Sequence, residues 1–236
     1  MIPVMMRFFS PHTAGVSDFV EDFEDVVGIT VYTAGGGGTA GRTTAYSGGS
    51  YELYVAPASN GYPTTARLND YQLTSADFDI SWSQSQCSDL VDSVNSVWSG
   101  LVARTSNWQN PSGIGSYNWG WCVYLHRDGT IVLGRSTDSS TSGGITNIDS
   151  KASGIGNYPG NAGNPNVRTI VDIRWRAVGD SHKVWVNDVL KIDITDSTFS
   201  TNAGYIACFT SPIAWTGLGT GYGYQALFDN ISITEL

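Results

Sequence analysis

The glutamates are the side chains with which this chain could cleave a glycosidic bond, and their placement does not suit that reaction. A retaining glycosidase holds two carboxyl groups about 5 to 5.5 Å apart across the scissile bond. Glu21 and Glu24 are three residues apart, so on a strand they would point to opposite faces. The only other glutamates are Glu52 and Glu235, which are far from both in the sequence. The glutamates therefore predict no catalytic pair.

Aspartates are more numerous and alternate with apolar residues. Asp77 and Asp79 share one strand face, and Asp172 shares another with Arg174 and Arg176. Because alternate residues of a half-buried strand point to solvent, we interpret these positions as solvated faces. A catalytic carboxylate pair is the less favoured alternative.

Histidine and cysteine indicate no site. The three histidines, His12, His126 and His182, fall in different segments with no Ser or Cys in a nucleophile context, so a catalytic triad is not supported. No Cys or His pair has the spacing of zinc ligands. An odd number of cysteines in a large chain argues against a disulfide framework. We expect Cys87, Cys122 and Cys208 to be buried free thiols.

Aromatic side chains gather in or beside long connections rich in Gly, Ser and Asn. Because pyranose C–H faces are apolar while hydroxyl groups need directed partners, such loops could bind a glycan. The favoured alternative is that the rings pin the loops to the domain or contact another protein subunit. The candidates are Trp108, Tyr117, Trp119, Tyr158, Trp215 and Tyr222.

The N-terminus is an apolar arm. Pro3 and Pro11 resist its inclusion in a regular sheet, and an exposed arm of this kind would promote aggregation. We therefore expect it either to dock on a partner or to fold back as an edge strand of its own domain. Its apolar residues are Ile2, Val4, Met5, Met6, Phe8 and Phe9.

Composition excludes several classes of function. The chain has 236 residues, 12 Lys and Arg against 21 Asp and Glu, and a net charge of −9. Nucleic-acid binding needs a cationic face, so no nucleic-acid partner is expected. No stretch approaches the roughly 18 to 20 apolar residues of a membrane span, so membrane insertion is not expected either. The opening residues do not form an export signal.

Period-two alternation predicts an all-β fold. Phe78, Ile80 and Trp82 alternate with polar residues, and residues 171–177 repeat the pattern. Two-residue turns at Asn187-Asp188 and Asp128-Gly129 predict hairpins. Further strands are expected at residues 26–33, 51–56, 97–104, 119–127, 130–135, 182–186, 189–194, 204–209 and 224–233. The segments 34–50, 106–118, 136–166 and 211–223 are expected to be long connections, and 88–96 carries a weak helical signal.

No internal repeat or linker divides the chain. We predict an apolar arm at residues 1–17 and one antiparallel two-sheet β-sandwich at residues 18–236.

The order of elements in the C-terminal half resembles the concanavalin A-like lectin and glucanase superfamily, close to its laminin-G-like branch. The resemblance implies a jelly-roll fold. It also extends upstream to an opening strand at Asp22-Phe-Glu-Asp25 and a central strand at residues 99–104. The motifs that carry it are Trp119-Gly-Trp-Cys-Val-Tyr-Leu-His-Arg-Asp-Gly-Thr130, Val171-Asp-Ile-Arg-Trp175, Val184-Trp-Val-Asn-Asp-Val189, Asp193-Ile-Thr-Asp196, Gly204-Tyr-Ile206 and Ala226-Leu-Phe-Asp-Asn-Ile-Ser-Ile233.

The resemblance also implies what to look for in a site. Glucanases of this superfamily place two Glu and an intervening Asp on one strand, and that motif is absent, so we expect no enzyme and no required cofactor. Many members hold a structural Ca²⁺ between the opening and closing strands. Asp22 and Asp229 match those strands and are the candidate ligands of such an ion.

Together these features predict a non-catalytic jelly-roll interaction protein. The favoured hypothesis is a phage or virus virion component, such as a capsid decoration or cement protein or a receptor-binding part, which is assembled in the host cytoplasm and contacts other subunits or a capsid or tail protein. The alternative is an extracellular carbohydrate-binding lectin or module. A divergent glycoside hydrolase is the third hypothesis.

Overall fold

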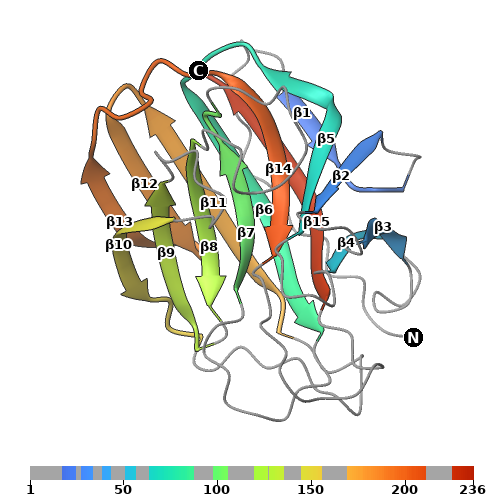
Figure 1. Ribbon diagram of the computed structural model, residues 1–236. Coiled ribbons are helices and arrows are strands. Elements are labelled where there is room, and N and C mark those ends of the chain that lie inside the picture. The colour runs from blue at the N-terminus through green and yellow to red at the C-terminus, as the bar shows by residue number, and fades with distance from the viewer. Residues whose placement is uncertain are drawn as a thin grey trace.

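The chain forms two antiparallel β-sheets that face each other (Figure 1). The computed structural model describes residues 18–24, 28–33, 39–43, 51–56, 64–87, 98–105, 120–126, 128–135, 145–155, 169–210 and 225–236. Every regular element within these ranges is a β-strand. This architecture confirms the predicted all-β, antiparallel two-sheet sandwich.

The first sheet, called sheet A, contains the strands nearest both ends of the described chain. Its order is β13-β12-β11-β6-β15-β4-β3, and β1 pairs with β15 beside this path. The strands are β1 (Asp18–Glu21), β3 (Thr39–Thr43), β4 (Glu52–Ala56), β6 (Phe78–Cys87), β11 (Val171–Val178), β12 (Ser181–Val186), β13 (Val189–Thr195) and β15 (Gln225–Glu235).

The second sheet, called sheet B, has the order β10-β9-β8-β7-β14-β5-β2. Its strands are β2 (Ile29–Thr33), β5 (Thr64–Leu73), β7 (Trp98–Ala103), β8 (Trp121–His126), β9 (Thr130–Arg135), β10 (Thr146–Ala152) and β14 (Gly204–Thr210). Neighbouring strands come from distant parts of the sequence, as where β14 lies between β5 and β7.

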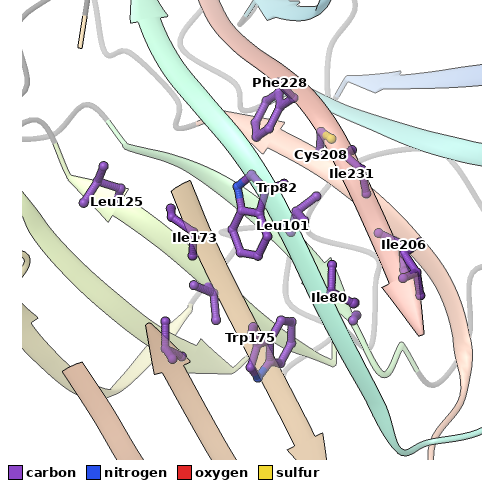
Figure 2. Packing of buried hydrophobic residues seen from close by; sticks show 14 of the residues in the cluster. Ile80, Trp82, Leu101, Leu125, Ile173, Trp175, Ile206, Cys208, Phe228 and Ile231 are labelled. Atoms are coloured by element: carbon purple, nitrogen blue, oxygen red, sulfur yellow. The ribbon is translucent and has the colours of Figure 1, made fainter. Parts of the chain in front are cut away.

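The core lies between the two sheets and is built from alternate residues of each strand. Trp82 and Trp175 point inward from sheet A, and Leu101 and Ile206 point toward them from sheet B (Figure 2). All four are at most 2% exposed. Burying a large apolar side chain contributes about 1.5 to 3 kcal/mol, so this layer is the main source of stability.

Both predicted hairpin turns are present. Asn187 and Asp188 have φ angles of 48° and 64°, the left-handed pair that a two-residue type I′ turn requires. In the β8–β9 hairpin, Gly129 has a φ of 81°, and the Asp128 carboxylate accepts a hydrogen bond from the Thr130 amide at 2.8 Å. Local turn chemistry therefore fixes the register of both pairs.

The predicted opening strand at Asp22-Phe-Glu-Asp25 is wrong. The strand is β1, and it ends at Glu21. Phe23 follows in the left-handed region with a φ of 59° and is completely buried. Its amide donates to the Glu21 carboxylate at 2.7 Å, and the Glu24 amide donates to Asp22 at 3.1 Å. The chain thus turns at this point and places Phe23 in the core.

Two of the expected long connections contain strands. β3 lies inside the segment 34–50, and β10 lies inside the segment 136–166. Both are edge strands. Most residues of β10 are exposed, and a strand exposed on both faces shows no alternation of apolar and polar residues. β5 was also not expected, because it has extra residues between Arg67 and Gln72, which pair with Ala207 and Tyr205, and these break the alternation of apolar and polar residues along the strand.

The other predicted strands are confirmed with shifted bounds. β2 begins at Ile29 rather than at residue 26, and β7 ends at Ala103 because Arg104 takes a left-handed φ of 54°. The N-terminal arm and the segment with a weak helical signal lie outside the described residues.

Candidate functional site

The outer face of sheet B is the candidate site. Along β7, β8 and β14, residues of the main core alternate with a second set that points away from the core. This second set, called the outer cluster, is Val102, Cys122, Tyr124, Val132, Ala207 and Phe209, with Trp98, Ile145 and Tyr205 packed against it. Sheet B therefore has apolar side chains on both faces.

Aromatic rings form the centre of the outer cluster. The Trp98 ring lies 5.0 Å from the Tyr124 ring and 5.3 Å from the Phe209 ring, measured between centroids. Gly100 lies between Tyr124 and Phe209 in the strand register. A β-carbon at Gly100 would be 1.9 Å from the Val123 carbonyl oxygen, so only glycine allows this packing.

The centre of the outer cluster is closed to solvent, and partly exposed polar and aromatic groups surround it. Tyr124 is 6% exposed and Phe209 is fully buried. Burial raises the pKa of the Tyr124 phenol, so this group stays neutral. Trp98 and Tyr205, in contrast, keep part of their surface exposed.

A small group on β5 and β14 combines an aromatic ring with hydrogen-bonding groups. We call Arg67, Asn69 and Tyr205 the Arg67 site. The Arg67 guanidinium lies 4.3 Å from the centroid of the Tyr205 ring, and its Nε donates to Asn69 Oδ1 at 3.0 Å. Arg67 and Tyr205 are partly exposed and Asn69 is exposed. The site thus combines an aromatic ring, a cation stacked over one face of that ring, and an amide.

Among the outward positions of β5, β7, β8, β9 and β14 whose side chains the structure describes, none is a carboxylate; the Asp70 side chain lies outside the described residues. The described outward positions are Thr65, Arg67, Asn69, Gln72, Trp98, Gly100, Val102, Cys122, Tyr124, His126, Thr130, Val132, Gly134, Tyr205, Ala207 and Phe209. These positions therefore hold no pair of acids such as a glycosidase uses.

The aspartates of sheet A, the alternative catalytic candidates, are held by other groups. Arg174 Nε donates to Asp79 Oδ1 at 2.7 Å, and its Nη2 donates to the other oxygen at 2.5 Å. Asp172 accepts from the Ser83 hydroxyl at 2.7 Å. Asp77 accepts from the Gly179 amide at 2.8 Å and pairs with Arg104. These carboxylates bind structural partners, which supports the non-catalytic interpretation of this face.

The candidate calcium ligands lie near each other in the sheet register but already accept local hydrogen bonds. β1 pairs with β15, with Glu21 opposite Ile231. Asp22 accepts from the Glu24 amide, and Asp229 accepts from the Asn230 amide and side chain at 2.8 and 2.9 Å. Among the described residues, no three His, Cys, Asp or Glu side chains are grouped as metal ligands. Since Ca²⁺ takes six to eight oxygen ligands, these two carboxylates alone do not make a site.

Two of the three predicted free thiols are described. Cys122 and Cys208 are unpaired and buried, and burial raises the pKa of both, so they act as small apolar side chains. The Cys87 side chain lies outside the described residues. No helix in the described part of the chain has the length and apolar character to cross a membrane.

None of the six loop aromatics predicted as ligand-binding residues belongs to the described part of the chain, and the same holds for the apolar arm. Both remain predictions. The described candidates Trp98, Tyr124, Tyr205 and Arg67 were not found from the sequence. The continuous apolar run Trp121-Cys-Val-Tyr-Leu125 was the available signal, because such a run is typical of a strand buried on both faces.

Solved structures of carbohydrate-active proteins share this fold. The carbohydrate-binding module CBM66 from Bacillus subtilis matches with a TM-score of 0.53 and 15% identity, over 89% of this chain and 98% of that one. The carbohydrate recognition domain of Emp46p, in a potassium-bound form, matches with a TM-score of 0.56 and 9% identity, over 84% and 88%. A β-glucanase from Bacillus licheniformis matches with a TM-score of 0.53 and 12% identity, over 95% and 100%.

All three are concanavalin A-like jelly rolls, so the resemblance inferred from the sequence is confirmed for the fold. No protein-family model and no curated protein sequence matches this chain.

Proposed function

We propose that this chain is a non-catalytic, lectin-like recognition module that binds carbohydrate on the outer face of sheet B. The observation that carries the proposal is the set of partly exposed groups on that face: the Trp98 ring and the Arg67 site, with no carboxylate among the outward positions whose side chains are described. An apolar platform with a few directed polar groups is typical of a small-ligand site.

The chemistry of a sugar fits the Arg67 site. The apolar C–H face of a pyranose stacks on an aromatic ring, and its hydroxyl groups need donors and acceptors at the ring's edge. Tyr205 supplies the ring, Arg67 supplies N–H donors and Asn69 supplies an amide. Because the Arg67 guanidinium lies over Tyr205 and donates to Asn69, the three groups hold one another in position, which lowers the entropy lost on binding.

Two of the solved structures with a similar fold support carbohydrate as the ligand, because one is a carbohydrate-binding module and the other is a carbohydrate recognition domain. The third is a β-glucanase, but the lack of a carboxylate pair at the outward positions whose side chains are described favours binding over glycoside hydrolysis.

A glycan array tests the proposal, with Tyr205→Ala and Arg67→Gln as variants. Sheet A offers a matched control, because Arg174 lies 5.0 Å from the Trp185 ring in the same kind of pair. We expect Tyr205→Ala to weaken binding at least about tenfold, the equivalent of roughly 1.4 kcal/mol, while Trp185→Ala leaves it unchanged. Binding to no glycan, or an equal loss in Tyr205→Ala and in the control Trp185→Ala, would refute the proposal.

Hydrolysis is tested separately. Incubation with β-glucan and a reducing-sugar assay should show no product above buffer. Release of sugar ends would refute the non-catalytic assignment and revive the glycosidase hypothesis.

The virion setting is a finer proposal, and it rests on the composition of the apolar arm. In that setting the module is attached to a capsid or tail through residues 1–9 and displays its glycan-binding face outward. The alternative setting is an extracellular module without such attachment. Deletion of the arm, described in the Discussion, separates the two.

A further inference from the structure

Arg104 connects the two sheets at the end of the sandwich where the Leu236 amide donates to the Asp77 carbonyl at 3.0 Å, close to the C-terminus. It follows β7 of sheet B, and its left-handed φ of 54° accompanies a side chain that is completely buried. Its Nε donates to the Ala76 carbonyl at 2.8 Å, in the turn before β6. Its Nη1 donates to the Gly179 carbonyl at 2.9 Å, in the β11–β12 turn. One guanidinium thus holds two turns of sheet A.

His182 on β12 lies directly behind this guanidinium and is completely buried. Its Nε2 is 3.4 Å from Arg104 Nη1, and its Nδ1 is 3.4 Å from Trp175 Nε1. The Trp121 ring covers the imidazole with centroids 4.2 Å apart. Because Arg and Trp nitrogens only donate hydrogen bonds, both imidazole nitrogens face donors.

This environment accepts only the neutral imidazole. A neutral ring has one nitrogen that accepts a hydrogen bond, whereas a protonated ring has none. Protonation would therefore remove the one acceptor nitrogen, leave both contacts between two donors, and place a second positive charge beside Arg104. The buried site offers no solvent to screen that charge.

The charged groups around His182 come from four elements. Asp77 precedes β6 and pairs with Arg104 at 3.3 Å, and Asp180 in the β11–β12 turn also acts on Arg104. Asp196 follows β13 and attracts a charge on His182, but it is paired with Arg135 of β9. Burial first, and Arg104 second, lower the pKa of His182 to about 3 despite Asp196.

We propose that Arg104 and His182 form an acid-sensitive latch, which holds this end of the sandwich closed at neutral pH and opens when His182 takes up a proton. The open form is the one that binds the proton, because solvent then reaches the imidazole. In that form the histidine has its ordinary pKa near 6.5. Below that value, each unit of pH lowers the ratio of closed to open molecules by up to tenfold.

The consequence is local. Opening frees the turns at residues 76–77 and 179–180 and exposes the Trp121 and Trp175 rings, while the Arg67 site lies on the other side of sheet B from His182. The latch is therefore a conformational device that acts independently of the proposed glycan binding.

Hydrogen exchange measured by mass spectrometry between pH 7 and pH 5 tests the latch on the full chain. Peptides covering residues 98–105 and 174–183 should lose protection progressively below pH 6.5 in the wild type. In His182→Gln, which cannot take up a proton, protection at neutral pH should equal protection at pH 5 after correction for intrinsic exchange. His126→Gln, which removes a partly exposed histidine on the outer face of sheet B, should behave like the wild type.

Equal pH dependence in His182→Gln and the wild type would overturn the proposal, as would constant protection in the wild type. If His182→Gln fails to fold, the imidazole resonances of the wild type decide. A His182 signal that titrates near pH 6.5 with protection intact would overturn the latch, and a signal that stays neutral until protection is lost would support it.

Discussion

Replacing Arg104 by Met should destabilise the protein by about 3 kcal/mol. The substitution keeps an unbranched apolar side chain but removes every donor. The carbonyls of Ala76 and Gly179 would lose charge-assisted hydrogen bonds of 2.8 and 2.9 Å, and a hydrogen bond to a charged group contributes about 1.5 to 3 kcal/mol, with the lower end applying here because Gly179 is exposed. The pair with Asp77 is longer, at 3.3 Å, and Asp77 is 35% exposed, so its loss adds about 1 kcal/mol or less. Relief from burying a guanidinium offsets part of the total.

Urea denaturation followed by tryptophan fluorescence measures the change, and in a thermal scan it corresponds to a fall in Tm of about 6 to 12 °C for a chain of this size. Arg176→Met is the matched control, because Arg176 is an exposed arginine on the outer face of sheet A. It should change the free energy of unfolding by less than about 0.5 kcal/mol. A loss below about 1 kcal/mol in Arg104→Met would refute the reasoning that Arg104 holds the two turns.

Glu235 accepts hydrogen bonds from Tyr71, Thr74 and Ser75, and these bonds outweigh the effect of burial and lower the pKa of its carboxyl group. The stability that this carboxylate contributes should be complete at neutral pH and should fall as the pH drops below about 4.5. An acid unfolding transition that is the same in Glu235→Gln and in the wild type would contradict this. Deleting residues 1–9 should abolish co-purification with a large particle while the sandwich still melts cooperatively, and unchanged assembly rejects the arm as an attachment device. Because Asp22 and Asp229 alone do not make a Ca²⁺ site among the described residues, EDTA should leave the Tm unchanged, whereas a fall in Tm that added Ca²⁺ reverses would show a structural ion.

The sequence predicts the strands that have one buried and one solvated face. In β6 and β11, apolar residues alternate strictly with polar ones, and the structure buries Phe78, Ile80, Trp82 and Trp175 as expected. The sequence also predicts the hairpin at Asn187 and Asp188, because the two left-handed positions of its turn favour these residue types. In these elements a local pattern and the global fold agree.

The strands that escaped prediction lack such a pattern for identifiable reasons. β3 and β10 are edge strands, so neither needs a continuous apolar face. The outer cluster was missed because β8 is apolar at successive positions, and a run such as Cys122-Val-Tyr-Leu125 does not show which side chains face the core. Only the pairing of β7 with β8 and β14 brings Trp98, Tyr124 and Phe209 together.

The contact between Arg104 and His182 could not be predicted from the sequence either. Arg104 sits at the end of a predicted strand, where an arginine ordinarily points to solvent, and His182 appeared only as an isolated histidine. Their contact depends on the left-handed turn at Arg104 and on the packing of the two sheets, which bring together residues 78 positions apart. Sequence spacing carries no signal for such a pair.

Mapping a bound glycan onto the backbone tests directly whether the outer face of sheet B binds carbohydrate. Amide chemical shifts should be recorded while the strongest ligand from the glycan array is titrated into the protein. We expect the amide shifts of residues 65–69 and 204–209, around Arg67, Asn69 and Tyr205, to change and to saturate. The amide shifts of sheet A should not change. Shifts centred on β11, β12 and β13 would contradict the assignment of carbohydrate recognition to the outer face of sheet B.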